Sequence, residues 1–370
     1  MKIDSLELHH FRNHSHLTLK FKNGITTIVG RNGLGKTNII EAIYYTSSLG
    51  SHRVNSDDPL IEHGCDSAQI NVTATKHNRQ AKIQVNLNKH SNNSVQLNGS
   101  IVRRPRDIVG VLQVVVFSPE DLDLVKGDPA VRRKFIDTFM MLYAPRVADI
   151  KQSYERALKQ RNSLLKSAGR KKLSDSASQT LEVWDEQITK FGAQLVEQRM
   201  KGLNLLKPFV QSFGDVISGE TESFDVTYSS HWLNPESKGI NEIEGDLKLA
   251  LVNRRNDEID RGITLSGPHR DDLTILLSGN PVKGYASHGQ AWSTAIALKL
   301  ATFHALREHE GDPILILDDV FAELDQQRRN RLANLITNIE QVIITVADIK
   351  DVPEVLTGTH LWLEDGAHHA

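Results

Sequence analysis

The chain is poor in cysteine and shows no excess of either charge. Cys65 is the single cysteine among 370 residues, so neither an internal disulfide nor a zinc site built from several cysteines can form, and a reducing compartment is favoured. Lysine and arginine number 44 and aspartate and glutamate 46, which leaves a net charge of -2. A nucleic-acid surface would therefore have to come from local clusters of basic residues and not from the total charge.

Long apolar runs are also missing. The longest stretches, such as residues 114–117 and 314–317, are far too short to span a bilayer. Residues 1–5 lack the apolar run of a signal peptide. We therefore expect a cytoplasmic protein that has no membrane partner.

The pattern of apolar residues predicts an α/β protein of two or three domains. Period-two runs between residues 70 and 97 indicate an antiparallel meander with one wet face. Other apolar runs indicate buried strands at 111–117, 314–317 and 342–346. Helices are expected at 38–49, 129–142, 288–307 and 325–338. We divide the chain into 1–150 and 256–370, which form one head, and an inserted, mainly helical lobe at 151–255.

The inserted lobe carries a helical seam. Its apolar residues are spaced by three and four positions, at Leu181, Trp184, Ile188, Phe191 and Leu195. The spacing fails at Gln198 and Gly202, so the seam lasts under three heptads. This length favours a short helical hairpin over a long coiled coil.

A glycine-rich loop follows an apolar strand near the start of the chain. Its sequence fits the phosphate-binding pattern G-x-x-x-x-G-K-[ST] with Gly30, Arg31, Asn32, Gly33, Leu34, Gly35, Lys36 and Thr37. In such a loop, backbone N–H groups point at phosphate oxygens, the lysine reaches the β and γ phosphates, and the threonine hydroxyl binds Mg²⁺. The pattern and its strand–loop–helix setting predict nucleotide binding and outweigh a chance match.

Two adjacent carboxylates end the apolar run at 314–317. Asp318 is predicted to hold Mg²⁺, as a strand-end aspartate does in P-loop proteins. Asp319 is predicted to polarise the attacking water as a general base. The alternative is a buried strand that ends in a helix-capping aspartate, which the P-loop upstream makes the weaker interpretation.

The distance between these motifs points to the kind of nucleotide-binding head. Lys36 and Asp318 lie about 280 residues apart, which small GTPases and kinases do not require, so a segment is inserted into the head. The guanine-reading pattern Asn-Lys-x-Asp is absent, because Asn88-Lys89 continues to His90-Ser91. ATP is therefore favoured over GTP.

A third motif opens the helix expected at 288–307. Ser287 and Gln290 have the spacing of a capping box, which is common at helix starts. Together with Gly289 they also fit an ABC-type signature, in which a serine hydroxyl, a glycine amide and the helix N-terminus contact the γ-phosphate held by a second subunit. Both interpretations are compatible.

These head motifs resemble those of ABC/SMC ATPases, and the sequence around them is similar to that of RecF-family proteins. The residues that carry the resemblance span nearly the whole chain, at 11–13, 36–38, 51–53, 117–122, 126–129, 132–135, 266–273, 287–290 and 317–325. The block Gly267-Pro268-His269-Arg270-Asp271-Asp272 is the most distinctive of them.

The resemblance implies an ABC-type ATPase head, with a mixed sheet and an antiparallel β portion, plus a helical second lobe. It implies a homodimer that forms with bound ATP and Mg²⁺, each ATP lying between one P-loop and the partner's Ser287, Gly289 and Gln290. It assigns Arg12 and Asn38 to the nucleotide site and places Asp325 near the partner's site. Lys36, Asp318 and Asp319 would act in a slow ATPase, because aspartate replaces the glutamate usual at position 319.

The resemblance also implies a DNA-repair switch. RecF-like dimers bind double-stranded DNA at gap boundaries, with single-stranded DNA a further possibility, and work with RecO and RecR to load RecA in recombinational repair, replication restart and the SOS response. Four basic runs, at 103–106, 132–134, 170–172 and 254–255, are each more typical of a solvated surface than of a DNA contact. An ABC transporter's ATPase subunit is the alternative, and an SMC structural protein would need a far longer coiled coil.

Overall fold

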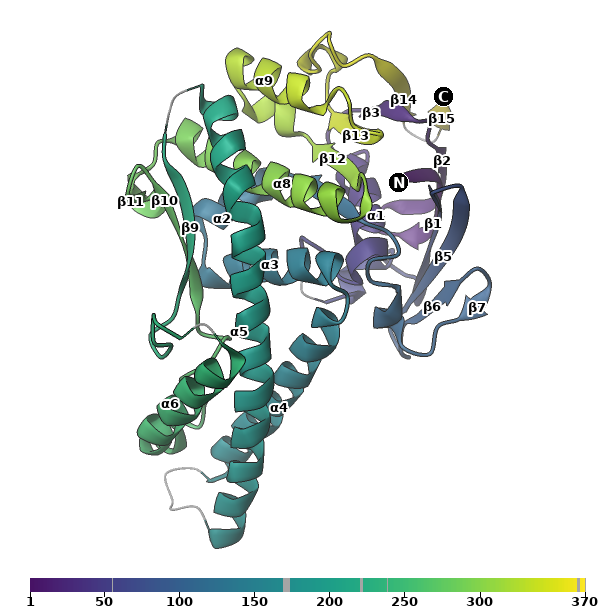
Figure 1. The fold of residues 1–370 in the computed structure, drawn as a ribbon. Helices are drawn as coiled ribbons and strands as arrows, with labels where there is room; N and C mark the ends of the chain where they lie inside the picture. The colour runs from purple at the N-terminus through teal and green to yellow at the C-terminus, as the bar shows by residue number, and fades with distance from the viewer. Residues whose placement is uncertain (55, 169–173, 220–221, 238, 365–366, 370) are drawn as a thin grey trace.

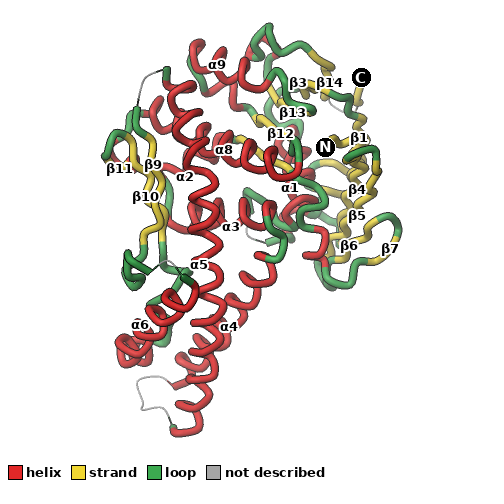
Figure 2. Tube along the Cα trace, viewed as in Figure 1, coloured by secondary structure: helices red, strands yellow, loops and turns green. Residues whose placement is uncertain are grey.

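The computed structural model describes residues 1–370 except 55, 169–173, 220–221, 238, 365–366 and 370. The described chain contains an antiparallel sheet, a mostly parallel sheet, a small third sheet and helices around them (Figure 1). The helices gather on one side and below, and most strands gather on the other side (Figure 2). This arrangement confirms the predicted α/β head with an antiparallel portion and a helical region. The basic run at 170–172 lies outside the described residues.

The antiparallel sheet has the order β2-β1-β4-β5-β6-β7. Its strands are β1 (Lys2–Phe11), β2 (His14–Lys20), β4 (Ser67–Lys76), β5 (Arg79–Asn88), β6 (Ser94–Leu97) and β7 (Ser100–Ile101). Buried and less buried residues alternate along β4 and β5, which pair antiparallel. The predicted meander with one wet face is confirmed.

The mostly parallel sheet has the order β15-β14-β3-β13-β12-β8. Its strands are β3 (Gly24–Val29), β8 (Val114–Phe117), β12 (Ile314–Asp318), β13 (Gln341–Val346), β14 (Gly358–Glu364) and β15 (Ala367–His369). Only the β14–β15 pair is antiparallel among the described strands of this sheet. The carboxyl ends of β3, β13 and β12 therefore meet at one edge.

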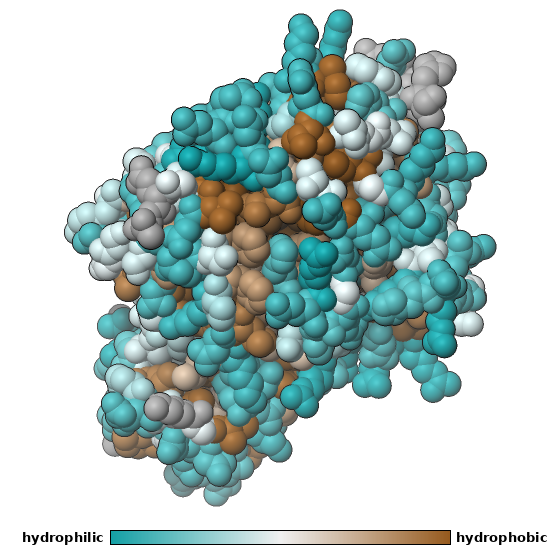
Figure 3. Space-filling view, turned by 45° about the horizontal axis from the view of Figure 1, so that its top comes forward, coloured by the Kyte–Doolittle hydropathy of each residue, from teal (hydrophilic) through white to brown (hydrophobic). Residues whose placement is uncertain are grey.

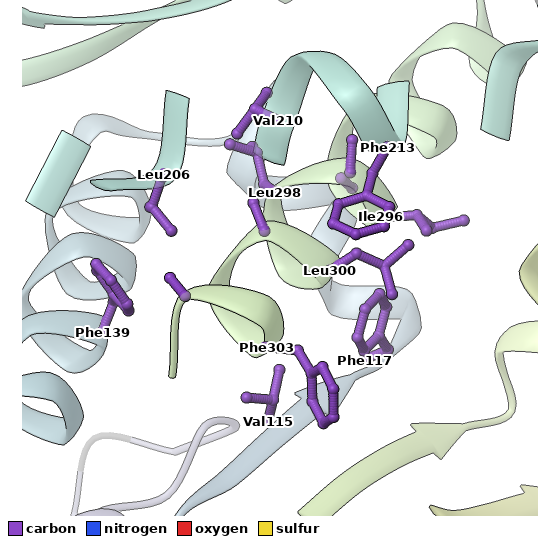
Figure 4. Close-up of a cluster of buried hydrophobic side chains, with 14 of the residues drawn as sticks. Val115, Phe117, Phe139, Leu206, Val210, Phe213, Ile296, Leu298, Leu300 and Phe303 are labelled. Atoms are coloured by element: carbon purple, nitrogen blue, oxygen red, sulfur yellow. The ribbon is translucent and has the colours of Figure 1, made fainter. Parts of the chain in front are cut away.

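Both faces of the parallel sheet are covered, which explains the continuous apolar runs of its strands. Val114 and Val116 of β8 join a core with the antiparallel sheet and α1 (Lys36–Ser48). Val115 and Phe117 point to the opposite core, formed with α3 (Pro129–Tyr143), α5 (Asp175–Ser218) and α8 (His288–Glu310) (Figure 4). The helix that follows β3 is thus held between two sheets.

The helical region consists of α4 (Val147–Ala168), α5 and α6 (Ile240–Arg261), with α4 and α6 packed beside α5 (Figure 1). The third sheet pairs β9 (Phe224–Ser229) with β10 (Asp272–Leu277), which also pairs with β11 (Asn280–Pro281). β9 lies in the range 151–255 and β10 outside it, so one sheet joins the two ranges. The lobe boundaries stay a prediction.

The apolar seam is interrupted at Gln198 and Gly202, as its spacing predicts, but the helix does not end there, because α5 continues as one helix of 44 residues. The seam changes its partner where its apolar spacing fails. Arg199 forms a buried ion pair with Asp137 of α3, and a Cβ on Gly202 would lie 2.7 Å from the Met140 sulfur. The second half of α5 therefore packs on the head, where buried apolar residues resume the spacing of three and four at Leu203, Leu206, Val210, Phe213 and Ile217.

The remaining elements are short connections and one helix beside the parallel sheet. They are α2 (Leu122–Lys126), α7 (Val282–Tyr285), α9 (Gln326–Ile336), and the 3₁₀ turns at Asp58–Leu60, Pro105–Ile108, Pro119–Asp121, Val320–Glu323 and Ile349–Asp351. α1 begins at Lys36 rather than at residue 38, and α9 ends before residue 338. None of the described helices has both the length and the apolar character needed to cross a membrane.

Candidate nucleotide site

The glycine-rich loop joins β3 to α1, as the strand–loop–helix pattern requires. Gly33 and Gly35 adopt φ angles of +92° and +93°, which favour glycine. A Cβ on Gly35 would also lie 2.4 Å from His14 Nε2. At Gly35, both the backbone conformation and the close approach of His14 therefore require glycine. The loop turns sharply at this point and leads directly into α1.

The Lys36 side chain folds back onto this loop. Its side chain is buried, and its ammonium donates hydrogen bonds to the Gly30 carbonyl at 2.8 Å and to Asn32 Oδ1 at 3.2 Å. The same nitrogen lies 4.0 Å from Asp319 Oδ2. The loop thus places a cation beside its own backbone and beside Asp319, the carboxylate that directly follows β12, as a phosphate-binding loop would.

Thr37 and Asp318 converge from opposite sides of β13. The Thr37 hydroxyl donates to Asp318 Oδ1 at 3.4 Å, although the two residues lie 281 positions apart. Thr345, on β13 between them, donates its hydroxyl to the same carboxylate oxygen. Burial is the main cause that raises the pKa of Asp318 to about 6. Mg²⁺ prefers oxygen ligands such as hydroxyls and carboxylates. The Thr37 hydroxyl and the Asp318 carboxylate lie side by side, so these two residues could bind the same ion.

Asp319 begins the turn after β12 with a left-handed backbone, at φ +52°. Its N–H donates to the Thr345 hydroxyl at 3.0 Å, and its side chain is 31% exposed beside Lys36. Burial raises the pKa of Asp319, and the Lys36 charge opposes that rise. The carboxylate is therefore fixed, accessible and more basic than an ordinary aspartate, which suits a general base.

Glu120 also belongs to this site, although sequence reasoning did not assign it. Its charge raises the pKa of both Asp318 and Asp319, and its carboxylate lies 3.7 Å from Arg53 Nε. It follows β8, the parallel neighbour of β12. The signal that could have found it is this strand order, because an acid just past a strand next to β12 must lie near Asp318.

Arg12 and Asn38 lie beside the loop. Arg12 donates two hydrogen bonds of 2.8 Å to the buried carboxylate of Glu41. Burial raises the pKa of Glu41, but hydrogen bonds from Arg12 and Ser51 outweigh it and lower the pKa overall. Asn38 donates to Asn13 at 2.7 Å. In the structure Arg12 braces α1, and its contact with a nucleotide stays a prediction.

The expected capping box at the start of α8 is present. Gln290 N–H donates to the Ser287 hydroxyl at 3.2 Å, and Ser287 N–H donates to Gln290 Oε1 at 3.0 Å. Asp325 caps α9 by accepting from Arg328 N–H at 2.9 Å. The Arg328 guanidinium lies against Gly289, where a Cβ would be 2.9 Å away. The structure thus brings Asp325 close to the signature residues.

The two halves of the predicted site are not joined within this chain. Among the described residues, no hydrogen bond or ion pair links Ser287, Gly289 or Gln290 to residues 30–38. The P-loop gathers Thr37, Asp318 and Asp319 around itself, whereas the signature lies with Asp325. This separation is compatible with the prediction that the signature serves a second copy.

Comparisons with known proteins decide the family. The model for the RecF/RecN/SMC N-terminal domain matches residues 2–355. The chain is 42% identical over 372 residues to the DNA replication and repair protein RecF of Frankia alni, and this match covers 99% of the chain and 98% of the relative. It is 41% identical to the RecF protein of Streptomyces avermitilis, with 99% of each chain covered. The chain belongs to the RecF family.

Solved structures agree with this RecF assignment. A structure of the recombination mediator protein RecF-ATP in the RecFOR pathway shares 28% identity with a TM-score of 0.90, and the match covers 99% of this chain and 96% of that chain. The Smc head domain of Pyrococcus furiosus shares 19% identity with a TM-score of 0.54, which shows a common head fold. Membership of the RecF family argues against the ABC-transporter alternative.

Proposed function

We propose that this chain is an ATP-dependent switch for recombinational DNA repair. The observation that carries the proposal is the convergence of the P-loop with the carboxyl end of β12, where Thr37 lies 3.4 Å from Asp318 and Lys36 lies 4.0 Å from Asp319. Residues 30–37 would bind the phosphates of ATP, with Arg12 and Asn38 at the edge of the site. Thr37 and Asp318 would hold Mg²⁺.

The proposed reaction is slow hydrolysis of ATP to ADP and phosphate. Bound Mg²⁺ would supply positive charge that offsets the phosphate oxygens. Asp319 would accept a proton from the attacking water, and its raised pKa supports this role. Its side chain is one carbon shorter than glutamate, so it would position the water less well. Slow turnover would suit a switch, because bound ATP has to hold the active state long enough to act.

A homodimer completes the proposed site. The Ser287 hydroxyl accepts a hydrogen bond from Gln290, and its own hydrogen remains available for a phosphate oxygen. The N-terminus of the 23-residue α8 adds a partial positive charge at the same place. Ser287, Gly289 and Gln290 would therefore contact ATP on a second copy, with Asp325 beside them.

The proposed ligand of the dimer is double-stranded DNA at the boundary of a single-strand gap. Support comes from the relatives, which are named DNA replication and repair proteins, and from the solved RecF structures described as recombination mediators in the RecFOR pathway. We place RecO and RecR as partners that act with this chain in the cytoplasm to load RecA, in replication restart and the SOS response. The head would comprise residues 1–150 and 256–370, and the helical lobe residues 151–255.

One experiment tests the proposal directly. Retention of gapped duplex DNA is measured with and without Mg·ATP for the wild-type chain, for Lys36→Arg and for Lys20→Arg, a matched change at an exposed lysine on β2. ATP should increase retention for the wild type and for Lys20→Arg but not for Lys36→Arg. If ATP binds yet leaves DNA retention unchanged, the chain is no ATP-dependent DNA switch.

A further inference from the structure

A sizeable cavity in the described part of the chain lies away from the P-loop. It has a volume of about 660 Å³ and is lined by the end of α1, residues 49–51, 54 and 57, helices α3, α4 and α5, and His269. None of residues 30–38 lines it. Its volume falls in the range of about 300–1,000 Å³ that is usual for small-molecule sites. The cavity is therefore large enough for a ligand of its own.

Two neighbouring cations of α3, Arg133 and Lys134, line this cavity without an acidic partner. Arg133 donates to the backbone carbonyl of Asp271 at 2.6 Å, and Lys134 donates to the carbonyl of Ser51 at 2.9 Å. Neither forms an ion pair with any carboxylate of the described residues. Each carbonyl uses only one of the several N–H donors on its cation, so both side chains keep donors for a ligand.

The run at 132–134 is thus not the solvated surface that its sequence predicts. Arg132 is 5% exposed and pairs with Asp272 at 2.7 Å. Arg133 is half-buried, and Lys134 is exposed at the open side of the cavity. Arg132 and Arg133 face inward because α3 packs against β10 and Arg133 contacts the Asp271 carbonyl in the loop that precedes β10, whereas Lys134 stays exposed.

The other charged groups around the cavity largely cancel. Arg199 is paired with Asp137 at 2.7 Å, and Lys151 is paired with Glu155 on the same helix. Asp57 accepts hydrogen bonds from Tyr45 at 3.0 Å and from Asn93 at 2.7 Å. Counted together, the lining carries four cations and three carboxylates, a net charge of +1; among the described residues, Arg133 and Lys134 are the lining cations without an ion pair, and Asp57 is the lining carboxylate without one.

Neutral donors and burial strengthen the preference for an anion. Burial is the main cause that lowers the pKa of Arg133, the nearby charge of Arg199 lowers it further, and the charges of Asp272, Asp137 and Asp271 oppose this only in part. A bound anion would offset both effects. Tyr154 lies 2.6 Å from His269 Nδ1, and burial lowers the pKa of His269 to about 4, so this ring is neutral at pH 7. This ring therefore adds no charge to the cavity wall, and Asp137, the lining carboxylate on the same helix as Arg133 and Lys134, is paired with Arg199.

We propose that this cavity binds a phosphate group, held between Arg133 and Lys134 at the junction of the head and the helical region. The phosphate belongs to a free phosphate compound or to a nucleic-acid strand, since both present the same oxygens to the two cations. The site is separate from the P-loop and does not depend on the function proposed above.

The test measures binding of inorganic phosphate by isothermal titration calorimetry. A Lys36→Ala background removes the P-loop lysine as a competing phosphate ligand. In this background phosphate should bind, and Arg133→Gln or Lys134→Gln should weaken it by about tenfold or more, because each removes a charged hydrogen bond. Lys134→Arg keeps the charge and should bind normally. Lys248→Gln, an exposed lysine on α6 outside the cavity, should have no effect.

A 5′-phosphorylated thymidine dinucleotide added as competitor identifies the source of the phosphate. Displacement of inorganic phosphate indicates a nucleic-acid strand, and no displacement indicates a free phosphate compound; both outcomes keep the site. Circular dichroism and the thermal midpoint show whether each variant is folded. If Arg133→Gln does not fold, the comparison of Lys134→Gln with Lys134→Arg still tests the role of Lys134. Equal phosphate affinity in Lys134→Gln and Lys248→Gln, or no binding in the Lys36→Ala background, would overturn the proposal.

Discussion

Replacement of Asp318 by asparagine should make the protein more stable at pH 8 while it removes the Mg²⁺ ligand. Burial raises the pKa of Asp318 from 3.8 to about 6. The folded protein therefore binds more protons than the unfolded chain between these two values, and stability falls as the pH rises through this window. At about 1.4 kcal/mol for each pH unit between the two pKa values, the charged Asp318 costs about 3 kcal/mol above pH 6.

Asparagine keeps the shape and can still accept the hydrogen bonds from Thr37 and Thr345, but it carries no charge. In EDTA without nucleotide, the free energy of unfolding of Asp318→Asn should exceed that of the wild type by up to about 3 kcal/mol at pH 8 and by little at pH 4. Urea denaturation at both pH values measures the difference. Mg·ATP should then stabilise the wild type and leave the variant nearly unchanged.

Asp325→Asn is the matched control, because it makes the same chemical change with the opposite expected sign. The Arg328 N–H is the main cause that lowers the pKa of Asp325, so its charge stabilises the fold above pH 4, and this stabilisation is lost as the pH falls. Asp325→Asn should be slightly less stable than the wild type at pH 8. If Asp318→Asn is also no more stable than the wild type at pH 8, the buried Asp318 charge does not destabilise the folded protein, and the reasoning fails.

Three further predictions concern the site and its support. Ser287→Arg should leave ATP binding by the monomer near normal but abolish ATP-driven dimerisation in analytical ultracentrifugation, since an arginine at the α8 N-cap would block the partner's phosphate; an unchanged dimer would contradict the composite site. Thr345→Val should lower ATP turnover more than ATP affinity, because it removes the hydroxyl that positions both Asp318 and Asp319; equal losses in the two assays would show a general defect. Asp137→Asn should cost about 3–5 kcal/mol in urea denaturation, because Arg199 would be left buried without its counter-charge; a cost under about 1 kcal/mol would mean that the pair contributes little.

The site could be predicted from the sequence only where its residues are contiguous. The P-loop and the Asp318-Asp319 pair each lie in one short segment next to an apolar strand, so local pattern and secondary structure identify them. Thr345 lies on β13 and Glu120 in the turn after β8, and the place of both strands depends on the sheet order, which is a long-range property. Nothing local distinguishes the Thr345 hydroxyl from that of any other threonine in a buried strand.

The fold shows the same division between local and long-range information. The alternation along β4 and β5 predicts the antiparallel meander, because each strand has one wet face. The length of α5 could not be predicted, because its apolar spacing is interrupted at Arg199 and Gly202, where the helix is held by contacts with α3 residues far away in the sequence. Likewise, the sequence predicts that Arg133 is a surface charge, whereas in the structure its side chain donates a hydrogen bond to the Asp271 carbonyl.

Helix α1 connects the two sites considered above. It begins at Lys36 in the nucleotide site and ends at Ser48, which lines the cavity beside α3. Its 13 residues span about 20 Å, and a helix held between two sheets moves as a rigid element. Glu41, in its middle, accepts hydrogen bonds from Arg12 and from Ser51, and the Ser51 carbonyl in turn accepts one from Lys134. Ser51 therefore links the middle of α1 to Lys134 at the cavity, through its hydroxyl on one side and its carbonyl on the other.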